Sequence, residues 1–89
     1  MSLCRFDFEF HCESASLVRT MQTHVVGAGG ILAGTAAEGT FSLPTPIGVF
    51  EGTYRVEGRV IAIEVLEKPF FLPCSVIESR LRQYVREGI

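Results

Sequence analysis

The sequence predicts an α+β domain, in which a mostly antiparallel four-stranded sheet carries two helices on one of its faces. Three observations support this fold class. Apolar and polar residues alternate near the start of the chain, a hairpin pattern occupies the middle, and an amphipathic helix pattern lies near the end. The expected order is β-α-β-β-β-α, forming one two-layer domain over residues 1–89.

The first strand is predicted by strict alternation of side-chain type. One face would hold apolar side chains and the other polar ones: Cys4, Phe6, Phe8, Phe10 and Cys12 against Arg5, Asp7, Glu9 and His11. Successive side chains of a strand point to opposite faces, so we expect a buried face and a solvated face.

A helix follows, with Ser14 or Ser16 as its N-cap and an end near His24. Its apolar stripe would be Leu17, Val18, Met21 and Val25. His24 lies at the edge of this stripe, where a protonated imidazole would favour the helix C-terminus.

The next segment is rich in glycine and alanine and is the most ambiguous part of the chain. We expect a flexible turn at 27–30, a short strand around 31–37, and a strand end at Phe41 and Leu43 before two prolines. The whole segment 27–45 is a candidate mobile loop or ligand lid. A dinucleotide fingerprint would need a third glycine at Leu32, so no nucleotide site is predicted.

Residues 50–66 predict a β-hairpin. With Glu57 and Gly58 as a two-residue turn, Tyr54 would pair with Ile61 and Gly52 with Ile63. A longer loop with Gly58 in a left-handed conformation is the alternative, and it would shift this register. In the first register, Gly52 would mark a bulge, a close backbone approach or one wall of a pocket.

The outer face of the same hairpin would place Glu51 opposite Glu64. Two neighbouring carboxylates can perform acid/base chemistry when one pKa is raised. The alternative is a solvated pair whose repulsion is relieved by a neighbour such as Arg55.

The final helix is predicted by a capping box of Ser75 and Glu78. Its apolar stripe would be Ile77, Leu81, Tyr84 and Val85, and Gly88 would end it. Cys74 precedes the helix, where the helix dipole would stabilise a thiolate; the alternative is a small buried side chain at a corner.

Composition bounds the function classes. Hydrophobic residues make up 47% of the chain, which favours a homodimer, a protein partner or a bound apolar ligand. The net charge of −2 with eight Lys and Arg argues against nucleic acid as a partner. We expect no signal peptide, no membrane span, reduced cysteines and a cytoplasmic location.

No metal site or cofactor is predicted. Cys4 and Cys12 share a strand face but would lie about 26 Å apart, too far to ligate one ion together. No paired cysteine or histidine motif occurs elsewhere.

Our leading hypothesis is a non-enzymatic module that associates with itself or a partner through the outer sheet face, at Val49, Val60, Ala62 and Leu66. The alternative is a carrier of a small apolar ligand, with a pocket at Phe50, Gly52, Tyr54 and Ile63. A last helix packed on a curved sheet is similar to helix-grip folds, and that resemblance implies apolar ligands. A cysteine-dependent enzyme using Cys74 is a remote third hypothesis.

Overall fold

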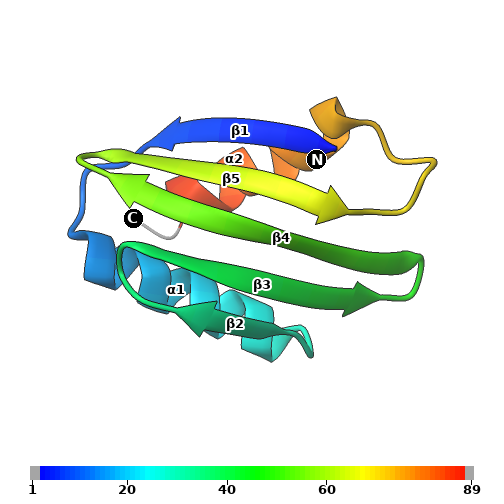
Figure 1. The fold of residues 1–89 in the computed structure, drawn as a ribbon, viewed down its shortest axis with the longest axis horizontal. Coiled ribbons are helices and arrows are strands. Elements are labelled where there is room, and N and C mark those ends of the chain that lie inside the picture. Colours follow the sequence, from blue (N-terminus) through cyan, green and yellow to red (C-terminus); the bar gives the residue numbers. More distant parts are fainter. Residues whose placement is uncertain (1–2, 88–89) are drawn as a thin grey trace.

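The computed structural model describes the backbone of residues 3–87 and the side chains of residues 3–83. The chain forms an α+β fold with an antiparallel sheet and two helices, as predicted, but the sheet has five strands rather than four. The strand order is β1-β5-β4-β3-β2. Both helices lie behind the sheet in the view of Figure 1.

The elements follow one another along the chain with short connections. They are β1 (Cys4–Glu9), α1 (Ser14–Gly27), β2 (Ile31–Gly34), β3 (Glu38–Thr45), β4 (Gly48–Glu57), β5 (Val60–Glu67) and α2 (Cys74–Glu87). Helix α1 packs against β2 and β3, whereas α2 packs against β1. The helices therefore cover opposite halves of the same sheet face.

The glycine-rich segment forms two strands. The short strand expected around 31–37 is present as β2, and Phe41 and Leu43 lie in β3, so most of 27–45 is strand rather than a mobile loop. A tight turn at 35–37 divides it into β2 and β3, which pair with each other, and β3 also pairs with β4. Pro44 lies inside β3 but beyond the part that β2 covers, an edge position where a missing N–H is tolerated.

The β4–β5 hairpin has a different register from the one predicted. Its two-residue turn is Gly58–Arg59, so Val56 pairs with Ile61 and Tyr54 with Ile63. Gly58 has a φ of 60°, a left-handed conformation that glycine adopts without strain. The shift is two residues along β5, so every side chain keeps its predicted face.

The shifted register also separates the predicted carboxylate pair. Glu64 lies opposite Thr53, and Glu51 lies opposite Glu67 across a β-bulge. Glu64 is 3.9 Å from Arg5 on β1, and the Ser42 hydroxyl donates a 3.4 Å hydrogen bond to Glu51.

Both predicted helix caps are wrong. The residue that precedes α1 is Glu13, which is extended and whose carbonyl accepts from the Leu17 N–H. Helix α2 begins at Cys74, so Ser75 is already inside it, and the Pro73 carbonyl accepts from the Ile77 N–H. The predicted stop at Gly88 lies outside the described residues, as do the side chains of Tyr84 and Val85.

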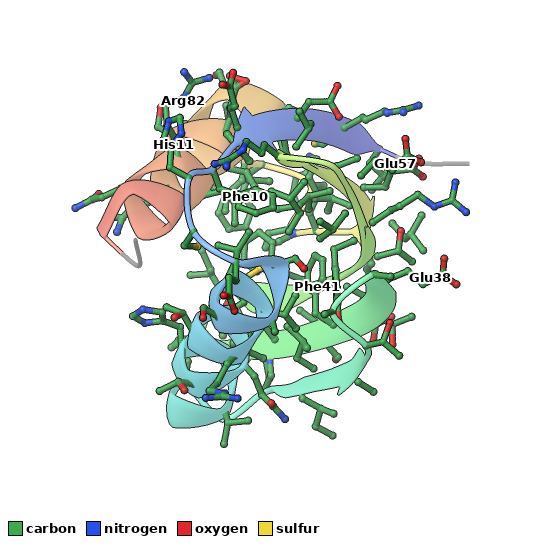
Figure 2. All side chains as sticks on the ribbon, turned by 90° about the vertical axis from the view of Figure 1, so that its left-hand side faces the viewer. Phe10, His11, Glu38, Phe41, Glu57 and Arg82 are labelled. Atoms are coloured by element: carbon green, nitrogen blue, oxygen red, sulfur yellow. A yellow bond between two sulfur atoms is a disulfide. The ribbon has the colours of Figure 1, made fainter. Side chains whose placement is uncertain are left out.

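The core lies between the sheet and the helices. Its most buried large side chains are Phe10, Leu17, Tyr54, Ile61 and Val65. In Figure 2, Phe10 and Phe41 point into this layer, whereas Glu38 and Glu57 project from the opposite face of the sheet. The predicted division of β1 into a buried and a solvated face is confirmed.

A disulfide joins the two ends of the fold. Cys4 in β1 and Cys74 in α2 are bonded, with 5.7 Å between their Cα atoms, and they are 70 positions apart along the chain. The prediction that these cysteines are reduced is therefore wrong. The sequence could not indicate the pair, because only the packing of α2 beside β1 brings them together. Cys12 is a free thiol.

Candidate functional site

An apolar pocket lies between the two helices and the inner face of the sheet. Its volume is about 160 Å³. Helix α1 contributes Leu17, Thr20, Met21, His24 and Val25, and Ala28 follows the helix; the sheet contributes Leu32, Phe41, Leu43 and Ile63; α2 contributes Leu81.

The pocket exists because the helices are splayed. Helix α1 covers the β2–β3 side of the sheet and α2 covers the β1 side, so neither fills the space over the middle. Phe41 on β3 and Ile63 on β5, with β4 between these strands, form the floor, while Met21 and Leu81 approach from the helices. Met21, Phe41 and Leu81 are only half-buried, so the pocket walls remain accessible to solvent.

The polar side chains that line the pocket are both on α1. The Thr20 hydroxyl donates a 3.0 Å hydrogen bond to the Ser16 carbonyl within the helix. His24 lies one turn further on and contributes its imidazole to the lining. The pocket therefore offers an apolar interior with polar groups on one wall.

The four residues predicted to form a pocket are dispersed in the structure. Ile63 lines the observed pocket. Phe50 packs against the core from β4, and Tyr54 is almost fully buried, with its hydroxyl donating a 2.7 Å hydrogen bond to the Thr35 carbonyl. A Cβ on Gly52 would meet the Glu64 carbonyl and the Phe41 ring, so the space beside Gly52 is filled.

The sequence analysis did not assign the α1 wall or Phe41 to a pocket. Leu17, Met21 and Val25 were recognised as an apolar stripe, which is the signal of a helix that faces a core. Whether such a stripe meets side chains or empty space depends on where the two helices lie on the sheet, a placement that the apolar pattern of one helix does not specify.

The outer face of the sheet carries the residues of the predicted interface. Val49, Val60 and Leu66 are exposed by 38%, 39% and 45%, and Ala62 is half-buried. Val60 and Ala62 lie in a shallow concavity that also contains two positive and four negative side chains: Arg5 and Arg55, with Asp7, Glu38, Glu57 and Glu64. The outer face is thus mixed rather than apolar.

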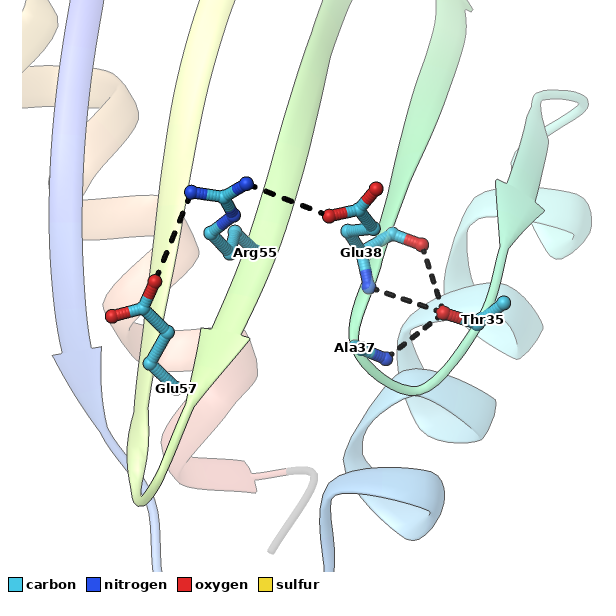
Figure 3. A network of polar contacts seen from close by, with 5 residues as sticks. All are labelled: Thr35, Ala37, Glu38, Arg55 and Glu57. Atoms are coloured by element: carbon cyan, nitrogen blue, oxygen red, sulfur yellow. Dashed lines mark hydrogen bonds and ion pairs between the residues drawn. The ribbon is translucent and has the colours of Figure 1, made fainter.

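Ion pairs organise part of this face. Arg55 lies between Glu38 and Glu57, at 3.7 and 3.8 Å (Figure 3). The Thr35 hydroxyl accepts hydrogen bonds from the Ala37 and Glu38 N–H groups, which shapes the β2–β3 turn. The side chains of Arg55, Glu38 and Glu57 are well exposed, so each ion pair contributes at most about 1 kcal/mol to stability.

The structure offers little to the third hypothesis. The Cys74 sulfur is bonded to Cys4 and is not a free nucleophile in this form. Among the described side chains, those of residues 3–83, no group of three or more His, Cys, Asp or Glu is placed to hold a metal ion. Within residues 3–87, neither helix is long and apolar enough to cross a membrane.

Comparison with known proteins gave no match: no family model, no curated protein and no solved structure resembles this chain significantly.

Proposed function

We propose that this domain binds a small apolar molecule in the pocket between α1 and α2. The observation that carries the proposal is a volume of about 160 Å³ lined almost entirely by aliphatic and aromatic side chains. A protein cavity of about 150 Å³ with such a lining stays dry and takes up benzene. The expected ligand is therefore a single ring or a short alkyl chain.

Thr20 and His24 refine the class of ligand. Both lie on the α1 wall, and hydroxyl and imidazole groups orient ligands that carry a polar atom. A small amphiphile, apolar over most of its length with one polar group, fits this distribution better than a pure hydrocarbon.

A pair of threonines on α1 provides a matched test. Thr20 and Thr23 each donate a 3.0 Å hydrogen bond to a carbonyl four residues earlier, but only Thr20 is among the residues that line the pocket. Thr20→Phe should place a ring in the pocket and weaken the binding of a benzene-sized probe such as toluene at least tenfold. Thr23→Phe should leave the affinity within twofold.

The measurement is a titration of each variant with toluene, followed by NMR. Equal affinity of the Thr20→Phe variant and the parent would contradict the proposal, provided that both fold as judged by circular dichroism. Equal weakening by Thr23→Phe would also contradict it, because the effect would then come from the helix rather than the pocket.

Self-association through the outer face is a second candidate, favoured by the exposed side chains of Val49, Val60 and Leu66. The concavity beside Val60 has an excess of negative charge, so pairing two copies would bring like charges together. A dimer of this kind should tighten as salt increases, and Val60→Glu or Leu66→Glu should dissociate it. Sedimentation velocity at low and high salt tests this; a parent that is monomeric in both would remove the candidate.

The redox state of Cys4 and Cys74 bears on the compartment in which the protein works. The disulfide favours an oxidising compartment over the cytoplasm, where thiols are kept reduced. Alkylation in denaturant, without a reductant, should modify one of the three cysteines, Cys12. Modification of all three would restore the cytoplasmic expectation.

A further inference from the structure

One end of the molecule exposes apolar side chains that the pocket does not use. We call this end the apolar tip and define it by Leu3, Ile47, Leu66, Phe70 and Phe71, which are 54%, 52%, 45%, 93% and 54% exposed. In Figure 1 it is the end where β1 begins, β5 ends and the β3–β4 turn lies. Phe70 is almost wholly in water.

The two loops of the tip touch each other. A Cβ on Gly48 would lie 2.8 Å from the Pro69 ring, so the β3–β4 turn packs directly on the loop between β5 and α2. Gly48 has a φ of 142°, a backbone conformation that residues with a side chain rarely adopt. The close approach and the backbone conformation therefore both require glycine. Ile47 and Phe70 are thereby carried on one contiguous structure.

The loop that bears the phenylalanines is braced from within. The Lys68 ammonium donates hydrogen bonds to the Leu72 carbonyl at 2.7 Å and the Pro69 carbonyl at 3.5 Å. The Leu72 N–H donates to the Pro69 carbonyl at 3.1 Å, and Pro69 is buried. The Cys4–Cys74 disulfide fixes the end of the loop. These contacts fix the loop backbone that carries Phe70 and Phe71. The two rings make an edge-to-face contact with each other, with 5.5 Å between their centroids.

Charge is absent from the two loop segments that carry Ile47, Phe70 and Phe71. Residues 39–50 and 69–77 contain no Asp, Glu, Lys, Arg or His. Next to these segments, Lys68 directs its charge at carbonyls of its own loop, and Glu51 and Glu67 lie opposite each other on β4 and β5 at the base of the tip. An apolar end without charged apex residues can enter a lipid interface, where each ionised group would oppose insertion.

We propose that the apolar tip docks on a lipid bilayer with zwitterionic headgroups, inserting Phe70, Phe71 and Ile47 at the interface. A second copy fits less well, because a stable protein interface uses about 20–30 residues on each side and the tip is two short convex loops. Lipid adapts to a convex surface. The carboxylates at the base disfavour anionic headgroups, so attraction by charge plays no part.

The test is co-sedimentation with phosphatidylcholine vesicles. The parent should bind, and the double variant Phe70→Ser with Phe71→Ser should lower the partition coefficient at least tenfold, because two large apolar side chains leave the interface. Val26→Ser changes an exposed apolar side chain on α1 and should alter it less than twofold. Binding should persist in 1 M salt. The Debye length is then about 3 Å, so salt screens attraction between charges but does not weaken the insertion of apolar side chains.

A tryptophan reporter gives an independent readout, because the chain contains no tryptophan. The emission of Phe70→Trp should shift to the blue with vesicles and be quenched by brominated lipid, whereas Val26→Trp should do neither. A parent that stays in solution at millimolar lipid would overturn the proposal. So would a dimer that the Phe70→Ser, Phe71→Ser variant dissociates, because the tip would then bind protein.

Discussion

Tyr54 connects the central strand of the sheet to the β2–β3 turn. It is 2% exposed, lies on the central strand β4, and its hydroxyl donates to the Thr35 carbonyl in the β2–β3 turn. A Cβ on Gly39 would collide with the Tyr54 ring, so the small residues of β3 make room for it. One phenol therefore fixes the turn that the sequence left ambiguous.

Burial raises the pKa of Tyr54 above its usual value near 10, because the phenolate loses hydration. The stability that this burial supports is complete below pH 10 and falls as the pH rises through the folded-state pKa. Tyr54→Phe should lower the unfolding free energy by about 1 kcal/mol at pH 7, through loss of the hydrogen bond. Its further decline above pH 10 should be shallower than the parent's.

Urea unfolding at pH 7, 9 and 11 measures both effects. The parent and the Tyr54→Phe variant should differ most at pH 7 and converge at pH 11. If the unfolding free energies of the two proteins declined in parallel over this range, the pKa of Tyr54 would be the same in the folded and unfolded protein, and burial would not raise it.

At the scale of elements, the β4–β5 hairpin shows what pattern can and cannot predict. Alternation assigns the inward side chains correctly, because a register shift of two residues leaves every face unchanged. It does not locate the turn. The missing side chain of Gly52 does indicate a bulge or a close backbone approach, and both are present. Strands β2 and β3 were less predictable, since Gly34, Gly39 and their alanine neighbours give no apolar alternation, and partners on β4 decide their conformation.

Gly52 distinguishes a packed contact from a pocket wall. A Cβ there would meet the Glu64 backbone carbonyl as well as the Phe41 ring, and the backbone cannot move aside cheaply. Gly52→Ala should therefore lower the unfolding free energy by about 1–3 kcal/mol.

The control for this variant is Gly27→Ala, whose Cβ would meet nothing within 4 Å. It should be neutral or slightly stabilising, because alanine favours the helix more than glycine does. Denaturant midpoints compare the two. If Gly52→Ala were as stable as Gly27→Ala, the close contact of Gly52 with the Glu64 carbonyl and the Phe41 ring would be contradicted.

At the scale of the whole molecule, the disulfide between Cys4 and Cys74 joins segments that are 70 residues apart in sequence. Closing a loop of that length in the unfolded chain corresponds to a stabilisation of about 4 kcal/mol in the chain-entropy model. Reduction should lower the unfolding free energy by up to this amount.

Urea unfolding with and without a reductant measures the effect. A Cys12→Ala variant should respond to the reductant as the parent does, whereas a Cys4→Ala, Cys74→Ala variant should not respond. A parent insensitive to reductant would show that the bond is absent from the native protein.

The pocket also belongs to this scale, because it depends on how both helices lie on the sheet. Sequence periodicity predicted that Leu17, Met21 and Leu81 face inward, and the structure places all three at the pocket. The empty space itself arises from α1 and α2 covering separate halves of the sheet. Residue patterns specify which side chains face inward, but they do not specify how far apart two helices stand.

The most direct measurement is a methyl NMR titration of the parent protein with toluene. We expect saturable shifts at Leu32, Leu43 and Leu81, which line the pocket, and none at Val49 or Val60 on the outer face. Shifts confined to the outer face or the apolar tip, or no saturable shift at the pocket methyls, would contradict the account of a ligand site between the helices.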